Sequence, residues 1–162
     1  MTPEERRQFV REHRTCIWGY ERQAGPPSMS VVYYVMDGDD ILISTMKERA
    51  KAKAMERNPQ VSLCVVDEQW PMTYLVVYGR GRIIDEPAQA VAVMAGITEL
   101  MSGQAPSAED MPKIEAMCRD EHRVVARITP EATFETPPRH VYADTDLNTV
   151  THGLGNTLAW DA

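Results

Sequence analysis

Apolar positions along the chain fall into short runs separated by turn residues, a pattern typical of an antiparallel β protein. Runs rich in β-branched and aromatic side chains predict six strands, at residues 15–20, 29–36, 41–45, 60–66, 73–85 and 121–135. Most connections are short, which favours antiparallel pairing because parallel neighbours require long crossovers. Six antiparallel strands in one small domain are expected to close into a barrel, which leaves no exposed edges.

Helical periodicity is inserted between these strands. It is found at residues 3–13, in a basic segment after residue 45, at 87–101 and near 107–117. Two glycines, Gly79 and Gly81, predict a bend or bulge in the strand 73–85. The last 27 residues have no strong period. We therefore divide the chain into a domain over residues 1–135 and a C-terminal tail or arm over 136–162.

Composition and charge exclude several classes of protein. The chain has 162 residues and a net charge of -7, which fits one domain and argues against a nucleic-acid partner. No apolar run approaches the roughly 18 residues of a membrane helix, and residues 1–14 are too polar for a secretory signal. We therefore expect a cytoplasmic protein without a membrane partner. Three scattered cysteines and four histidines lack zinc-type spacing, so we expect no metal site.

Positive charge gathers in one segment of this acidic chain, "STMKERAKAKAMERNP" at residues 44–59. The segment reads as a strand end, a polar corner and the start of a helix. Ser44 and Thr45 are candidates to cap the helix. The first-turn amides of a helix point outward unpaired, and its dipole adds partial positive charge, so a phosphate would be favoured there.

The spacing of the cations limits how they could share an anion. Arg49 and Lys51 are two residues apart and would splay by about 200° on a helix, since each residue turns 100°. They could hold one anion only if Arg49 sits in the corner before the helix begins. Arg49 and Lys53 are four apart and could share a helix face. A merely solvated basic helix remains an alternative at this point.

Several segments together resemble a known family. The series "GPPSMSVVYYVMDGDDILISTMKERAKAKAMERNPQVSLCVV", "YLVVYGRGRIIDEP" and "RVVARITPE" is similar to the split-barrel flavin and deazaflavin oxidoreductases, which include the pyridoxamine 5'-phosphate oxidase-like proteins. The resemblance covers residues 10–131. It implies a mainly β fold with helices (α+β): a six-stranded antiparallel split β-barrel. It also implies a homodimer, with two cofactor sites at the interface that hold either FMN or the deazaflavin coenzyme F-420.

The resemblance also implies positions for the cofactor. Its phosphate, and in a deazaflavin its acidic tail, would lie at the corner formed by Ser44, Thr45, Arg49, Lys51 and Lys53. The ring would lie against the strand that carries Ser28, Ser30, Val31 and Val32. From the partner chain, Trp70 and Tyr74 could reach the ring.

The pair Arg49-x-Lys51 looks more like the deazaflavin-dependent branch, because pyridoxamine phosphate oxidases proper have serine before the x-Lys pair. Those enzymes also end in a segment with tryptophan and arginine, whereas this chain ends in "NTLAWDA". We therefore expect an oxidoreductase that uses coenzyme F-420 to transfer a hydride to a conjugated small-molecule acceptor. An FMN-dependent oxidase or reductase, a non-catalytic flavin or deazaflavin carrier and a protein–protein module remain alternatives.

The resemblance is incomplete at Val31 and in the tail, and it identifies no catalytic residue. Family members usually have proline where Val31 stands, and valine restores a backbone N–H. We identify no catalytic residue; the proton could come from solvent or from a hydroxyl such as that of Tyr33 or Tyr74. If the tail covers the substrate pocket, the candidates within it are His140, Tyr142 and His152.

Overall fold

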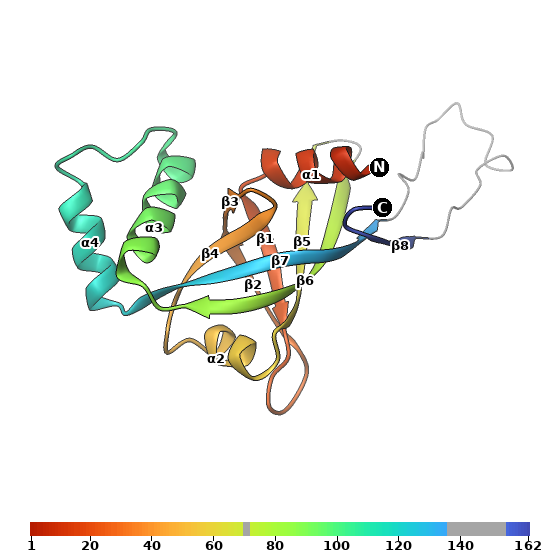
Figure 1. Ribbon diagram of the computed structural model, residues 1–162, viewed down its shortest axis with the longest axis horizontal. Coiled ribbons are helices and arrows are strands. Elements are labelled where there is room, and N and C mark those ends of the chain that lie inside the picture. The colour runs from red at the N-terminus through yellow and green to blue at the C-terminus, as the bar shows by residue number, and fades with distance from the viewer. Residues whose placement is uncertain (70–71, 136–154) are drawn as a thin grey trace, which may run out of the picture.

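The computed structural model describes residues 1–69, 72–135 and 155–162, which form four helices and an eight-stranded sheet. The helices are α1 (Pro3–Glu12), α2 (Ala50–Arg57), α3 (Pro87–Ser102) and α4 (Met111–Asp120). The strands are β1 (Thr15–Tyr20), β2 (Ser28–Tyr33), β3 (Val35–Asp37), β4 (Asp40–Met46), β5 (Gln60–Asp67), β6 (Thr73–Ile84), β7 (Arg123–Glu135) and β8 (Asn156–Ala159). Figure 1 shows their arrangement.

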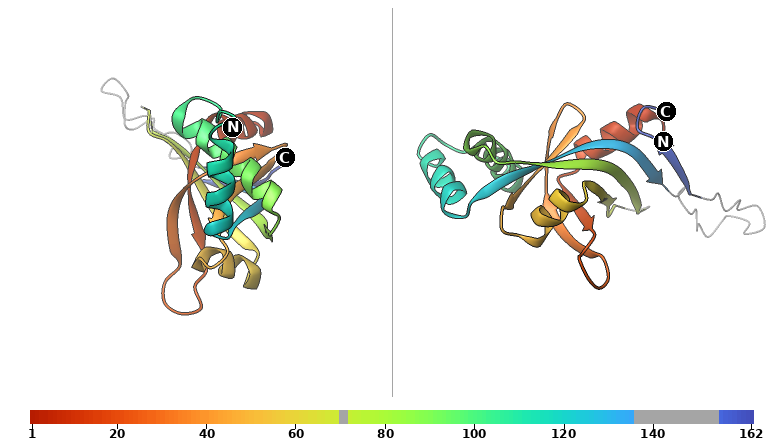
Figure 2. Two further views of the ribbon diagram at one scale, coloured as in Figure 1. Left: turned by 90° about the vertical axis from the view of Figure 1, so that its left-hand side faces the viewer. Right: turned by 60° about the horizontal axis from the view of Figure 1, so that its bottom comes forward.

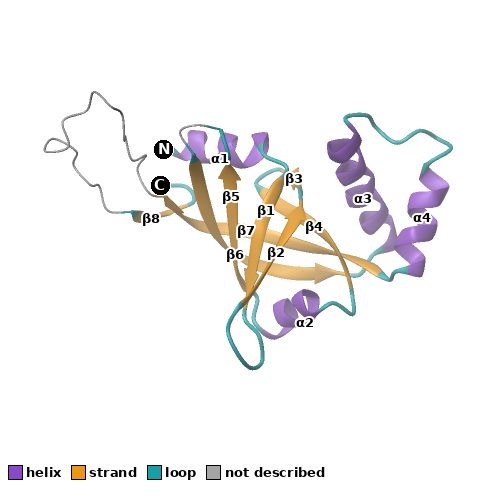
Figure 3. Ribbon diagram, turned by 180° about the vertical axis from the view of Figure 1, so that it is seen from behind, coloured by secondary structure: helices purple, strands orange, loops and turns teal. Residues whose placement is uncertain are grey.

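The strand order in the sheet is β2-β1-β5-β6-β7-β4-β3, with β8 added beside β7. Every pair is antiparallel, and the sheet curls into a half-barrel (Figures 2 and 3). The predicted mainly β fold with antiparallel pairing is therefore confirmed. The expected count of six strands is wrong for two reasons. The run 29–36 is divided between β2 and β3 at Tyr34, and the C-terminal segment adds β8.

The two glycines of β6 allow close contacts on the sheet. The register of β6 against β7 shifts between Tyr78 and Gly79, so the predicted bulge is confirmed. A Cβ atom at Gly79 would lie 2.6 Å from the carbonyl oxygen of Thr129. The residue opposite is Pro130, which has no N–H to donate and is tolerated in a sheet at such irregularities. A Cβ atom at Gly81 would collide with Met55, so this glycine lets α2 pack against β6.

Apolar side chains are buried on both faces of the sheet. The main core fills the inside of the half-barrel, where Trp18, Leu63 and Ile128 are inaccessible to solvent. Val10 of α1 and Met55 of α2 add to this core from two ends of the sheet. A second cluster forms on the outer face, where α3 packs its side chains Ala90, Val93 and Ile97 against Val125 of β7. The barrel and the α3–α4 hairpin are thus separate packing units on one sheet.

The last residues are part of the fold rather than an arm. Strand β8 pairs with the end of β7, and Trp160 is only 5% exposed. Arg6 of α1 is 1% exposed, and its Nη2 donates to the carbonyl oxygens of Ala159, Trp160 and Ala162. The prediction of a tail is therefore wrong for residues 156–162. The tail candidates His140, Tyr142 and His152 lie outside the described residues.

Among the described residues, no helix combines the length and the apolar character needed to cross a membrane. The same residues contain no cluster of three or more histidine, cysteine, aspartate or glutamate side chains that could hold a metal ion.

Candidate cofactor-binding site

The corner between β4 and α2 positions the predicted cations. Strand β4 ends at Met46, and Arg49 is the N-cap residue of α2, with an extended backbone (φ −68°, ψ 145°) and no side-chain capping bond. The backbone N–H of Lys47 donates to the carbonyl oxygen of His122 over 2.9 Å, which ties the corner to the start of β7. Arg49 therefore sits before the first turn, the placement that its spacing from Lys51 requires.

The prediction that Ser44 and Thr45 cap α2 is wrong. Both residues lie within β4, where alternation sends their side chains to opposite faces. Thr45 is buried on the inner face, and the hydroxyl of Ser44 accepts a hydrogen bond of 3.2 Å from Nη1 of Arg123. Within the described residues, the backbone N–H groups of Ala50 and Lys51 have no hydrogen-bond partner. These two first-turn amides remain free to bind an anion.

Lys51 meets the ring-facing strand. Its Nζ donates to Oγ of Ser30 over 2.7 Å and lies 5.5 Å from the ring centroid of Trp18, the residue that pairs with Ser30 on β1. Burial, and then the nearby charge of Arg49, hold the pKa of Lys51 below its ordinary value of 10.5. The structure thus joins two predicted site residues, Ser30 and Lys51, which are 21 positions apart in sequence.

Ion pairs divide the basic segment into two kinds of cation. Lys47 lies 2.5 Å from a carboxylate oxygen of Asp85, and Lys53 lies 2.6 Å from one of Glu48. Across residues 1–69, 72–135 and 155–162, neither Arg49 nor Lys51 has a carboxylate partner; Nε of Arg49 contacts the sulfur of Met46 at 3.3 Å. Two neighbouring cations without counter-ions, together with two free amides, fit a phosphate group.

The ring-facing strand divides the other predicted residues between two faces. Ser28, Ser30 and Val32 alternate with exposed positions and pair with Tyr20, Trp18 and Cys16. Val31 lies on the opposite, outer face and is 72% exposed. Val32 packs against the main core that fills this side, so the inner face of β2 could offer a ring only the partly exposed Ser28 and Ser30, and not Val31 of the same chain.

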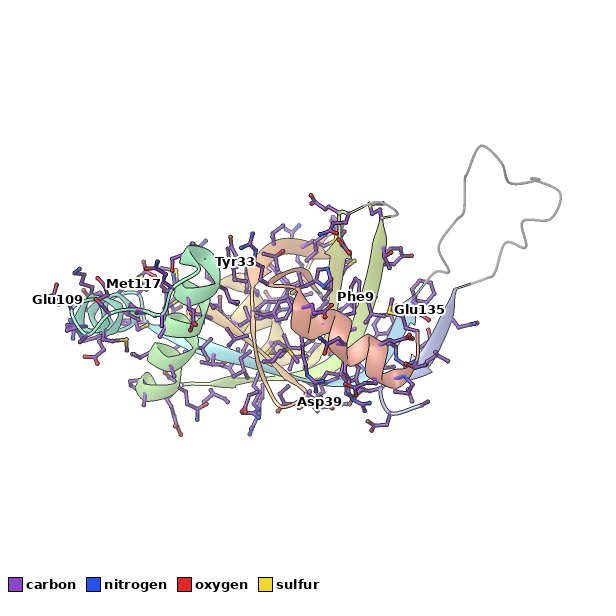
Figure 4. All side chains as sticks on the ribbon, turned by 90° about the horizontal axis from the view of Figure 1, so that it is seen from above. Phe9, Tyr33, Asp39, Glu109, Met117 and Glu135 are labelled. Carbon is purple, nitrogen blue, oxygen red and sulfur yellow. The ribbon has the colours of Figure 1, made fainter. Side chains whose placement is uncertain are left out.

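Of the two aromatic residues expected from the partner chain, Tyr74 does not reach this corner within one chain. Tyr74 pairs with Val66 at the far end of β5, about 20 Å from α2 at ~3.3 Å per strand residue. Trp70 lies outside the described residues. Tyr33, considered as a proton donor, packs in the outer cluster under α3. Figure 4 labels Tyr33 beside this helix, on the side of the molecule away from Glu135.

Sequence reasoning missed Trp18 and Arg123. Trp18 forms the floor under Lys51, and its indole N–H is buried with no acceptor among the described residues. Arg123 reaches the corner from β7 through Ser44. The signal for Trp18 was its place opposite Ser30, which requires the register of β1 with β2. Alternation in 15–20 and 28–33 indicates which residues share a face but does not fix the register, so the sequence alone does not place Trp18 opposite Ser30.

A curled antiparallel half-barrel with an anion-suited corner after its fourth strand defines a protein like pyridoxamine 5'-phosphate oxidase. Residues 2–136 match the family described as pyridoxamine 5'-phosphate oxidase, and the chain belongs to it. The resemblance stated from the sequence is thereby confirmed. A search of curated proteins found no match.

Solved structures share this fold. A conserved hypothetical protein from Mycobacterium tuberculosis is 24% identical with a TM-score of 0.72, and the match covers 82% of each chain. An F-420 reductase is 21% identical with a TM-score of 0.59, over 78% of this chain and 93% of its own. A FAD-binding protein from Mesorhizobium loti is 18% identical with a TM-score of 0.63, over 82% and 92%. At such identities the similarity shows the fold alone.

Proposed function

We propose that this protein is an oxidoreductase that binds the deazaflavin coenzyme F-420 and reduces a conjugated small-molecule acceptor. The observation that carries the proposal is the pair Arg49 and Lys51, which face the β4–α2 corner without a carboxylate partner in the described chain. Two comparisons support the proposal: the chain belongs to the pyridoxamine 5'-phosphate oxidase family, and it shares the fold of an F-420 reductase. FMN is the alternative cofactor, because it also presents a phosphate.

The chain's own residues would bind the phosphate by three kinds of contact. The amides of Ala50 and Lys51 are donors at the positive end of the α2 dipole. The guanidinium of Arg49 can present two parallel N–H groups to phosphate oxygens. The ammonium of Lys51 is half-buried, so its attraction for an anion is less screened by solvent than that of an exposed lysine.

The end of β2 nearest α2 would orient the ring. Ser28 and Ser30 would offer hydroxyls there, whereas Val32 already packs against the main core. When bound, the cofactor supplies hydride transfer, while the protein positions it and excludes competing reactions. Tyr33 is packed under α3, so we assign the proton to solvent rather than to this hydroxyl.

A second copy of the chain would complete the site. On the outer face, one cross-strand row of side chains is entirely apolar. Val31 of β2 is exposed, and the others are partly exposed: Ile17, Cys64, Val76 and Phe134, from β1, β5, β6 and β7. Met29, two residues from Val31, is 73% exposed. Contiguous exposed apolar surface of this kind marks an interaction site. We propose that it pairs with a second copy, which would bring Trp70 and Tyr74 of that copy to the ring.

This arrangement also gives a role to the departure at Val31. The valine that replaces the family's proline lies on the outer face, away from the phosphate corner. We therefore propose that it affects the contact between subunits rather than the binding of phosphate.

Titration of the purified protein with F-420 and with FMN, followed by cofactor fluorescence, tests the proposal. Arg49→Ala and Lys51→Ala should each weaken binding at least tenfold, because a charge-assisted contact contributes about 1.5–3 kcal/mol. Lys113→Ala is the matched control, since Lys113 is exposed on α4 and paired with Asp110. If both variants bind the cofactor as tightly as the parent protein, the proposal is wrong and α2 is only a solvated basic helix.

The relative affinities decide between the two cofactors, and turnover decides between enzyme and carrier. Tighter binding of F-420 than of FMN supports the deazaflavin proposal, and the reverse order supports the alternative. Oxidation of the bound reduced cofactor by a panel of enones and quinones supports an enzyme. Tight binding without turnover across that panel indicates a carrier.

A further inference from the structure

The amines of this chain differ in whether a carboxylate neutralises them. The sequence contains four lysines, Lys47, Lys51, Lys53 and Lys113. All except Lys51 lie within 2.8 Å of a carboxylate oxygen. The α-amino group of Met1 is likewise paired, 2.6 Å from a carboxylate oxygen of Glu135. In the part of the chain that the structure describes, Lys51 is therefore the one amine without a carboxylate partner.

The surroundings of Lys51 favour its uncharged form. Its Nζ donates to Oγ of Ser30 over 2.7 Å and lies 5.5 Å from the ring centroid of Trp18, and neither of these side chains carries a charge. Burial, and then the charge of Arg49, hold the pKa of Lys51 below its ordinary value of 10.5. Desolvation and a neighbouring cation are two ways in which proteins make a lysine nucleophilic, because the neutral amine is the form that attacks. Lys51 has both.

An anchor for phosphate lies next to this amine. The guanidinium of Arg49 has no carboxylate partner among the described residues, and its Nε contacts only the sulfur of Met46 at 3.3 Å. Arginine is well suited to hold a phosphate through two parallel N–H groups. An acyl phosphate carries its reactive carbonyl carbon one oxygen away from phosphorus. A reagent of this class, held by its phosphate at Arg49, would therefore present that carbon to Lys51.

We propose that Lys51 is an acylation site, at which an acyl phosphate bound at the β4–α2 corner transfers its acyl group to Nζ. The amine nitrogen attacks the carbonyl carbon, so that a C–N bond forms and the C–O bond to the phosphate breaks. The electron pair of the broken bond leaves with the phosphate, and the nitrogen gives up a proton to solvent. The products are an amide and inorganic phosphate, with no change in oxidation state.

The modification would regulate the corner, and this consequence rests on the proposed function. Acylation removes the positive charge of the lysine and its attraction for an anion. The amide that forms keeps one N–H, which can still donate to Oγ of Ser30. A neutral amide is also less costly to bury than an ammonium group. The acylated side chain therefore fits its surroundings, while Arg49 alone remains to hold the phosphate of the cofactor.

The test compares two acyl donors on the full-length protein without cofactor. Acetyl phosphate carries the anchoring group, and p-nitrophenyl acetate lacks it. Peptide mass spectrometry follows the rate of acetylation at each lysine. Acetyl phosphate should modify Lys51 at least tenfold faster than Lys47, Lys53 or Lys113, and added inorganic phosphate should slow this reaction by competing for the corner.

A variant of the anchor separates a phosphate-directed reaction from general reactivity. Arg49→Ala should slow the acetylation of Lys51 by acetyl phosphate at least tenfold and change its reaction with p-nitrophenyl acetate less than threefold. Arg119→Ala is the matched control and should change neither rate, because Arg119 is exposed on α4 and paired with Asp120. Parent protein acetylated at Lys51 should bind F-420 and FMN at least tenfold more weakly than untreated protein.

Either of two results would overturn the acylation site: acetylation of all four lysines by acetyl phosphate at similar rates, or a fast reaction at Lys51 that neither Arg49→Ala nor inorganic phosphate slows. Unchanged cofactor affinity after acetylation would overturn the regulatory consequence. The acetylation rates need no cofactor, so they distinguish this proposal from the proposed function. Cofactor binding with unselective acetylation contradicts only the acylation site, and selective acetylation of a protein that binds neither cofactor contradicts only the proposed function.

Discussion

Lys51 and Lys53 are two residues apart on one helix, yet the structure gives them different surroundings. Lys51 is half-buried over Trp18, donates to Ser30 and has no carboxylate partner among the described residues. Lys53 is exposed and paired with Glu48. The comparison shows that a cluster of charges in a sequence does not define a binding site. Burial and the absence of a counter-ion distinguish a cation suited to a ligand from one that is only solvated.

The largest effect, on the stability of the fold, is expected from removing Trp18, the side chain that lies beneath Lys51. Trp18→Ala deletes a fully buried indole from the main core and should lower the free energy of unfolding by about 3–5 kcal/mol. Urea denaturation of the protein without cofactor measures it. A loss below about 1 kcal/mol would show that Trp18 is not the packed support described above.

The next effect separates the two lysines directly. Lys51→Met should weaken binding of the cofactor tenfold or more, and Lys53→Met less than threefold, since Lys53 is already paired and exposed. The lowered pKa of Lys51 means that its charged form is disfavoured in the folded protein. Lys51→Met should therefore leave the thermal stability of the cofactor-free protein unchanged or higher. Equal losses of affinity in the two variants would show that Lys51 and Lys53 do not differ in their contribution to cofactor binding.

The smallest effect is a dependence on pH. The pKa of Lys51 lies below 10.5 because of burial and the charge of Arg49, so this lysine loses its proton earlier than an exposed lysine as the pH rises. An anion binds the protonated form, and affinity should fall on the alkaline side, by less than the full effect of Lys51→Met. The change should be absent in Lys51→Met. Isothermal titration calorimetry at several pH values between 7 and 10 measures it; a parallel decline in the variant would assign it to other groups.

Local signals in the sequence predicted much of the fold. Six strand positions and the bulge at Gly79 follow from alternation and glycine. The placement of Arg49 before α2 was stated only as the condition for Arg49 and Lys51 to share an anion. Strand β8 was not predicted, because "NTLA" is short and is stabilised by contacts with β7 and Arg6 rather than by its own pattern. The fourth helix begins at Met111 rather than near 107, since residues 107–110 form a turn before it.

The candidate site could be predicted only in part. The sequence placed the cations behind a strand, and the family resemblance indicated the corner. The contact between Lys51 and Ser30 could not be read from spacing, because it depends on the register of β1 with β2 and on the packing of α2 across the sheet end. Ser44 and Thr45 were misassigned as caps because a strand that continues to Met46 looks, in sequence, like a strand that has ended.

The contact of Arg6 with the last residues of the chain has a practical consequence for protein engineering. It holds β8 against α1, so the two ends of the polypeptide lie next to each other (Figure 1). A short peptide could therefore connect Ala162 to Met1, and new ends could be opened at the exposed turn around Gly25. Such a circular permutant would retain every strand pairing while moving the termini beside α2.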